Sequence, residues 1–98
     1  MNINMEKNKE QVVLSLEGRL DTTSAPMLEK TIQELSENVT ALILDLKKLV
    51  YVSSAGLRVL LGAQKKMNKI GTMKLINVCE SVLEVLEMTG FADILVIE

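Results

Sequence analysis

The apolar residues of the chain fall into short runs that alternate between strand and helix patterns. Residues 3–6 and 11–16 predict two strands joined by a polar turn at residues 8–10, and Gly18 is expected to close the second strand. Residues 39–46 form a near-continuous apolar run, which is typical of a central strand covered on both faces. The N-terminal half therefore predicts a hairpin and a buried strand.

Elsewhere the apolar residues recur at helical spacing, so that each stripe predicts a helix with one buried face. The first stripe includes Pro26 in its first turn and follows three N-cap candidates, Thr22, Thr23 and Ser24. The three stripes are Ala25, Leu28, Ile32 and Leu35; Leu57, Leu60, Leu61 and Met67; and Val82, Leu83 and Leu86.

The remaining apolar runs predict two more strands, at residues 73–78 and 94–97. The elements then follow the order strand, strand, helix, strand, helix, strand, helix, strand. A chain of 98 residues is long enough for one hydrophobic core but not for two. We therefore expect one α/β domain over residues 1–98, with a mixed sheet of four or five strands and helices packed on it.

The charge and composition of the chain exclude several kinds of partner. A formal charge of −2 gives no electrostatic reason to bind phosphate backbones, and 2% aromatic residues leave few side chains on which bases could stack. Direct binding of nucleic acid is therefore not expected. No apolar run approaches the roughly 20 residues that span a bilayer, and residues 1–10 are too polar for a secretory signal. The sequence predicts a cytoplasmic protein with no membrane insertion.

The residue types required by most catalytic sites are missing. The chain has no histidine and one cysteine, Cys79, which excludes the usual zinc sets, an internal disulfide and every histidine-dependent nucleophile. No phosphate-binding loop is present, and no pair of carboxylates stands out by its spacing. We expect no catalytic residue, metal or cofactor, and Cys79 is expected to be a small buried or half-buried side chain.

Two hydroxyl groups, on Ser53 and Ser54, lie where the second predicted helix begins. A helix N-terminus presents unpaired N–H groups and the positive end of the helix dipole, so it can accommodate an anion such as a phosphate. The alternative is that one of these serines only caps the helix. The small residues Ala55 and Gly56 that follow would let a kinase or partner approach the backbone closely.

Residues 51–61, Tyr-Val-Ser-Ser-Ala-Gly-Leu-Arg-Val-Leu-Leu, resemble the signature of STAS domains of anti-sigma factor antagonists. That signature is an aromatic residue, an apolar residue, Asp or Ser, the phosphorylated Ser, a small residue, Gly and Leu. Supportive similarities at residues 17–21, 44–46 and 88–91 extend the resemblance over essentially the whole chain. The resemblance implies the STAS fold.

The resemblance also implies roles for individual residues. Ser54 falls on the phosphorylated serine, and Ser53, which stands where many relatives have Asp, is the alternative acceptor. Asp21 falls on the acidic residue of the loop before the first helix, near that serine; alternatively, it only binds local backbone N–H groups. The implied partner-binding residues are Asp21, Thr22, Ser53, Ser54, Ala55, Gly56 and Leu57.

The function implied by the resemblance is partner switching. The unphosphorylated protein would bind an anti-sigma factor that is also a serine kinase and so free a sigma factor. Phosphorylation of Ser54 would break the complex, and a serine phosphatase would restore it. Three other readings stay open: a STAS switch with a non-sigma output, a constitutive STAS subunit of a phospholipid-transport complex, and an enzyme.

Overall fold

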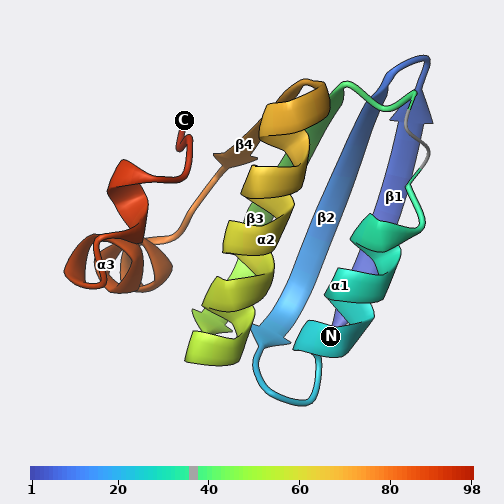
Figure 1. Cartoon of the computed structure of the whole chain (residues 1–98). Helices are drawn as coiled ribbons and strands as arrows, with labels where there is room; N and C mark the ends of the chain where they lie inside the picture. Colours follow the sequence, from blue (N-terminus) through green and yellow to red (C-terminus); the bar gives the residue numbers. More distant parts are fainter. Residues whose placement is uncertain (36–37) are drawn as a thin grey trace.

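The computed structural model of the chain describes residues 1–35 and 38–98. It shows a four-stranded sheet with helices packed against it (Figure 1). The predicted order of elements is confirmed as far as the third helix. In chain order the elements are β1 (Asn2–Asn8), β2 (Gln11–Leu20), α1 (Ala25–Gln33), β3 (Ala41–Val52), α2 (Ser54–Ile70), β4 (Thr72–Ile76), α3 (Glu80–Met88) and a 3-10 helix at Phe91–Asp93.

The strands lie in the order β1-β2-β3-β4, which confirms the predicted mixed sheet. β1 pairs antiparallel with β2, whereas β2 with β3 and β3 with β4 are parallel. The two parallel connections step in the same direction across the sheet, so crossovers of the same hand place α1 and α2 on the same face. Figure 1 shows these two helices side by side in front of the strands.

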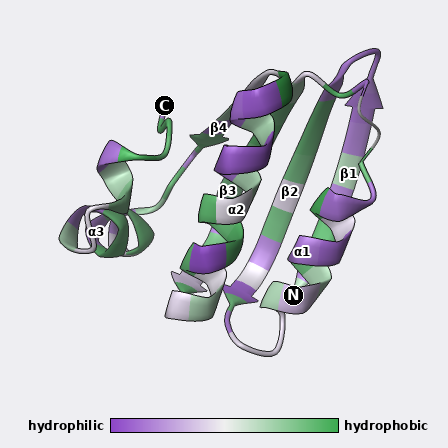
Figure 2. Ribbon diagram, in the orientation of Figure 1, coloured by the Kyte–Doolittle hydropathy of each residue, from purple (hydrophilic) through white to green (hydrophobic). Residues whose placement is uncertain are grey.

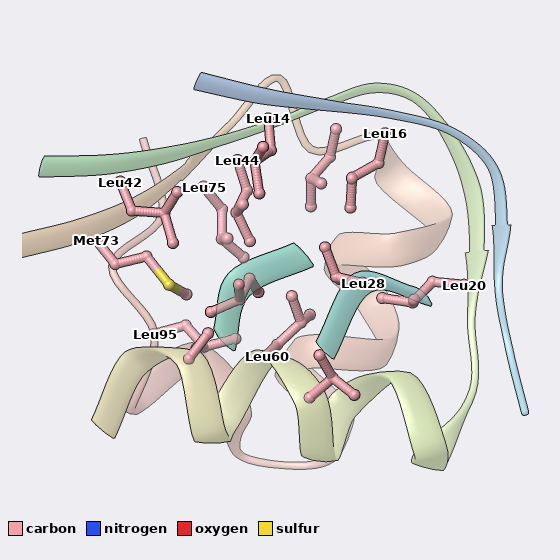
Figure 3. Packing of buried hydrophobic residues seen from close by; sticks show 14 of the residues in the cluster. Leu14, Leu16, Leu20, Leu28, Leu42, Leu44, Leu60, Met73, Leu75 and Leu95 are labelled. Carbon is pink, nitrogen blue, oxygen red and sulfur yellow. The ribbon is translucent and has the colours of Figure 1, made fainter. Parts of the chain in front are cut away.

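The core lies between this face of the sheet and the helices. Leu14, Leu44 and Leu75 are register partners on three adjacent strands, and each is completely buried. Figure 3 shows them pointing with Leu28 of α1 and Leu60 of α2 into one cluster. Burying each such side chain contributes about 1.5–3 kcal/mol. In Figure 2 the interior strand β2 is mainly hydrophobic and the edge strand β1 mainly hydrophilic, as their positions require.

The predicted strand at residues 94–97 is wrong, because the chain is still turning at Ile94 and Leu95 and only its end hydrogen-bonds to Leu75 of β4. Phe91–Asp93 forms a 3-10 helix, and the N–H groups of Ile94 and Leu95 both donate to the Phe91 carbonyl, at 3.0 and 2.9 Å. Only a single parallel bridge, between Leu75 and Ile97, follows. The described part of the sheet therefore has four strands.

Several predicted boundaries also differ from the structure. β2 continues through Gly18, which takes a φ of +108°, and ends at Leu20. β3 extends beyond residue 46 to Val52 because it pairs with this longer β2. The first helix ends at Gln33, so Leu35 lies beyond it, although its side chain still packs against the core.

Within the described ranges, no helix has both the length and the apolar character needed to cross a lipid bilayer.

Candidate functional site

The junction between β3 and α2 is held by Ser53. This residue is the N-cap of α2, and its Oγ accepts a hydrogen bond from the Gly56 N–H at 3.3 Å. Its own N–H donates to the Leu20 carbonyl at 2.8 Å, which fastens the start of the helix to the end of β2. Ser53 therefore has the capping role that the sequence analysis left open for either serine.

Ser54 is the first residue of α2, and its side chain is exposed. Its hydroxyl makes no hydrogen bond with any residue in the described part of the chain, in contrast to that of Ser53. A group attached to this oxygen would lie in solvent at the N-terminal end of a 17-residue helix. That end of a helix favours negative charge.

Gly56 and Leu57 are both buried, and Leu57 is only 6% exposed. A Cβ added to Gly56 would lie 2.7 Å from Cγ of Leu20 and 2.9 Å from its carbonyl oxygen. The expectation that Gly56 opens the backbone to a partner is therefore wrong. Its missing side chain lets α2 pack closely on β2, and Leu57 is part of the core beneath the site.

The loop between β2 and α1 is organised by the carboxylate of Asp21. Its Oδ1 accepts hydrogen bonds from the Thr23 N–H at 3.0 Å, the Thr23 hydroxyl at 2.7 Å and the Ser24 N–H at 3.2 Å. Asp21 therefore does bind local backbone N–H groups. Ser24 is the N-cap residue of α1, but its hydroxyl makes no capping bond and donates instead to the Arg19 carbonyl at 2.6 Å.

These hydrogen bonds stabilise the charged form of Asp21. Together they lower the pKa of Asp21 below its ordinary value, and the largest cause is the hydrogen bond from the Thr23 hydroxyl. Burial acts in the opposite direction and raises the pKa, but by less than this hydrogen bond lowers it. The N–H groups of Ser24 and Thr23 lower the pKa further. The carboxylate is therefore ionised at neutral pH.

Arg19 and Tyr51 add a second interaction at the same edge, which the sequence analysis missed. The Arg19 guanidinium lies 4.0 Å from the centre of the Tyr51 ring, and its Nε lies 3.8 Å from Oδ2 of Asp21. The two residues are register partners because β3 has an extra residue at each of two register shifts, one between the partners of Ser15 and Glu17 and one between those of Gly18 and Arg19. A β-bulge of this kind redirects side chains near functional sites.

The structure brings the predicted site residues together from two loops at one edge of the sheet. Leu20 and Val52 are register partners at the carboxyl ends of β2 and β3, so the loop that starts at Asp21 lies beside Ser53. Thr22 and Ala55 line a common surface hollow of about 200 Å³. Asp21, Thr22, Ser54 and Ala55 thus surround the start of α2.

In residues 1–35 and 38–98, no three His, Cys, Asp or Glu side chains gather in a way that could hold a metal ion. Cys79 is half-buried at the N-terminus of α3, with its Sγ 3.4 Å from the Leu49 carbonyl oxygen and from Ser81 Oγ. Its half-buried position confirms the expectation from sequence.

Comparison with known protein families matches residues 2–98 to the STAS domain. The chain belongs to the STAS domain family. This STAS domain is 32% identical over 96 residues to the anti-sigma-B factor antagonist of Bacillus subtilis, covering 97% of this chain and 88% of that protein. It is 31% identical over 98 residues to the anti-sigma F factor antagonist of Paenibacillus polymyxa, covering 97% and 84%.

Solved structures share the fold of this STAS domain. The unphosphorylated form of the Bacillus anti-sigma factor antagonist SpoIIAA superposes with a TM-score of 0.78 at 22% identity, covering 99% of this chain and 87% of that one. An anti-sigma factor antagonist from Mycobacterium paratuberculosis gives a TM-score of 0.86 at 23% identity, covering 98% and 83%. The STAS fold expected from the sequence is confirmed.

Replacing Thr23 by Val should raise the pKa of Asp21 toward its ordinary value, because the Thr23 hydroxyl is the main cause of the lowering. A carboxyl whose pKa is lowered by folding contributes stability above about pH 4, and this is lost as the pH falls through the folded pKa. Thr23→Val should therefore show a smaller loss of stability in acid. Side-chain carboxyl titration by NMR measures the pKa, and Thr22→Val is the control that should leave it unchanged. An unaltered Asp21 pKa in Thr23→Val would contradict the assignment.

Replacing Gly56 by Ala should lower the free energy of unfolding by about 1–3 kcal/mol, because the added methyl group overlaps Leu20. Gly62→Ala in the same helix is the matched control, since nothing lies within 4 Å of its added Cβ. That control should raise the free energy of unfolding by roughly 0.5–1 kcal/mol. Denaturant unfolding measures both, and equal effects would show that the Leu20 contact is unimportant.

Proposed function

We propose that this STAS domain is an anti-sigma factor antagonist that works by partner switching, with Ser54 as the switch. In its unphosphorylated form it binds an anti-sigma factor that is also a serine kinase, and a sigma factor is released. The kinase transfers a phosphoryl group from ATP to the Ser54 hydroxyl, and the complex dissociates. A serine phosphatase removes the phosphate and restores binding. The 31–32% identical relatives named as anti-sigma factor antagonists support this output.

The observation that carries the choice of Ser54 is the difference between the two neighbouring serines. The Ser53 hydroxyl already accepts the Gly56 N–H, and the residue is half-buried between β3 and α2. The Ser54 side chain is exposed and free of intramolecular hydrogen bonds within the described structure. A kinase can reach Ser54 without breaking the helix cap, which favours it over Ser53 as the acceptor.

The charges around Ser54 explain how a phosphate would change binding while the domain stays folded. Phosphorylation adds about −1.5 to −2 charge and three acceptor oxygens. The helix N-terminus accommodates that charge, whereas Asp21 in the adjacent loop is already negative. A partner surface that complements the unphosphorylated site then meets excess negative charge. Losing about 2.7 kcal/mol weakens a complex roughly a hundredfold.

In this scheme the domain is a ligand and a substrate, and it catalyses nothing itself. The nucleotide and its metal ion belong to the kinase, and the whole cycle takes place in the cytoplasm. The partner contacts Asp21, Thr22, Ser54 and Ala55, which are exposed or half-buried. Ser53, Gly56 and Leu57 contribute by holding the start of α2 in place.

Affinity capture from lysate of the source organism with wild type, Ser54→Ala and Ser54→Asp as baits tests the proposal. We expect wild type and Ser54→Ala to capture an anti-sigma factor kinase, which mass spectrometry identifies, and Ser54→Asp to lose it at least tenfold because the carboxylate mimics added charge. Melting curves of all three baits control for folding.

Equal capture of the kinase by all three baits would contradict the role of Ser54. Capture of a transport complex, or of a regulator of secretion or motility, in place of an anti-sigma factor would contradict the proposed output. Incubation of the captured kinase with ATP and each bait adds a second test, since Ser54→Ala should accept no phosphate.

A further inference from the structure

The exposed side of α2 carries positive charge that no acidic residue of the same helix balances. The 17 residues of α2 include four basic side chains and no acidic one. Since the whole chain has a formal charge of −2 and α2 contributes +4, the other residues carry −6. Three of the four basic side chains are exposed, namely Arg58, Lys65 and Lys69. The outer side of α2 is therefore a positive surface on an acidic domain.

The three exposed cations lie on one face of α2, in line with Ser54. Arg58 follows Ser54 by four residues. Lys65 follows Arg58 by seven residues, and Lys69 follows Lys65 by four. Residues at spacings of four and seven share a helix face. Arg58, Lys65 and Lys69 are here called the α2 stripe, which extends over roughly 16 Å along the helix. In Figure 2, hydrophilic bands recur along the length of α2.

No ion pair neutralises the α2 stripe within residues 1–35 and 38–98. Glu29 of α1 shares a surface hollow with Arg58, yet no ion pair joins the two side chains. Lys66, the fourth basic residue of α2, differs because it is half-buried and its Nζ donates to the Ile32 carbonyl at 2.9 Å. The charges of the α2 stripe are therefore available to a partner. The ion pairs between described residues all lie outside α2, at Arg19–Asp21, Lys48–Glu17 and Lys74–Glu98.

The helix dipole accounts for one cation of the α2 stripe but not for all three. Lys69 lies in the last turn of α2, where the negative end of the dipole favours a cation. Arg58 lies near the positive end, where the dipole gives it no such benefit. Helix faces that only meet solvent usually mix both signs, as α1 does with Glu29 and Lys30. A stripe of one sign instead creates a field that steers an oppositely charged partner.

We propose that the α2 stripe binds an acidic surface of the anti-sigma factor and speeds its association. The inference rests on the proposed function, which supplies this partner and places it at Ser54, about one helical turn from Arg58. Complementary charges across an interface raise the association rate and suppress wrong partners more than they add affinity. The α2 stripe thus determines how fast the partner is found, and the contact at Ser54 determines whether it stays.

The surroundings of the α2 stripe favour a protein over a membrane or a nucleic acid. None of the large hydrophobic side chains that are exposed in the described structure lies on α2, whereas a helix that inserts into a lipid surface needs them. The charge of −6 on the rest of the chain opposes the approach of an extended polyanion such as DNA. A compact acidic patch on a protein can meet the α2 stripe alone.

Phosphorylation of Ser54 would act on the same face of the helix. A phosphate adds a charge of about −1.5 to −2 one turn before Arg58, which offsets at least half of the +3 of the α2 stripe. The Arg58 guanidinium would also be drawn to the phosphate, in competition with a carboxylate of the partner. The modified domain would then attract its partner more weakly from a distance, besides losing the contact at Ser54.

Surface plasmon resonance with purified anti-sigma factor kinases of the source organism, at several salt concentrations, tests the α2 stripe. We expect the double variant Lys65→Glu with Lys69→Glu to associate at least tenfold more slowly than wild type at low salt. The difference should shrink severalfold in 0.5 M salt because the charges are screened. The matched control is Lys7→Glu with Lys47→Glu, which changes the net charge equally at exposed positions of β1 and β3 and should associate within about threefold of wild type. Melting curves check the folding of both, and glutamine in place of glutamate at residues 65 and 69 gives a milder variant with a smaller effect.

The outcomes separate this inference from the proposed function. If Ser54→Asp loses binding but both variants at residues 65 and 69 associate like wild type, the stripe proposal is overturned and the proposed function stands. Equal slowing by the control would assign the effect to net charge and also overturn it. If no kinase binds wild type, or Ser54→Asp binds as tightly, both fail. If the stripe variant keeps its kinase association but loses binding to phosphatidylserine vesicles or duplex DNA, the α2 stripe serves a polyanion and the proposal is overturned.

Discussion

The packing of the start of α2 against the end of β2 is the contact on which the rest of the site depends. The Ser53 N–H donates to the Leu20 carbonyl, and Gly56 leaves no room for even one carbon between the helix and Leu20. Leu20 is completely buried and is the register partner of Val52. It therefore contacts the end of β3 as well as the start of α2, and it is itself the last residue of β2. Because Asp21 follows Leu20 directly, the same contact sets the loop that contains Asp21 beside Ser53.

Two opposing electrostatic effects meet at this edge of the sheet. The N-terminus of α2 favours an anion, whereas the Asp21 carboxylate, held charged mainly by the Thr23 hydroxyl, disfavours a second one nearby. The Arg19 side chain lies between Asp21 and the Tyr51 ring and offsets part of that negative charge. Asp21 and Arg19 thus partly offset each other, and the proposed phosphate on Ser54 would add a charge of about −2 to this edge. A surface with this balance suits a binding switch that leaves the fold unaltered.

The sequence predicted those features that depend on local periodicity and missed those that depend on register. The stripes led by Leu28 and Leu60 identified the helices, and the run around Leu44 identified a buried strand, because each pattern repeats over several residues. Four apolar residues at 94–97 were too short a pattern to reveal that the carbonyl of Phe91 holds the chain in a turn. The pairing of Arg19 with Tyr51 depends on two extra residues in β3, and no local signal marks either register shift. For Gly56, the sequence indicated a close approach but not that the approaching group is Leu20 of the same chain.

The two glycines of α2 illustrate how the same residue type can be required by packing at one place on a helix and not at another. Gly56 faces inward, where contact with Leu20 excludes any side chain, so its place is determined by the fold. Gly62 lies six residues later on the exposed side, where the domain would be more stable with alanine. Natural proteins are rarely at their stability optimum, so a suboptimal glycine on an exposed helix face needs no functional reason. The place of Gly56 is therefore determined by its contact with Leu20, whereas no contact within the described residues determines that of Gly62.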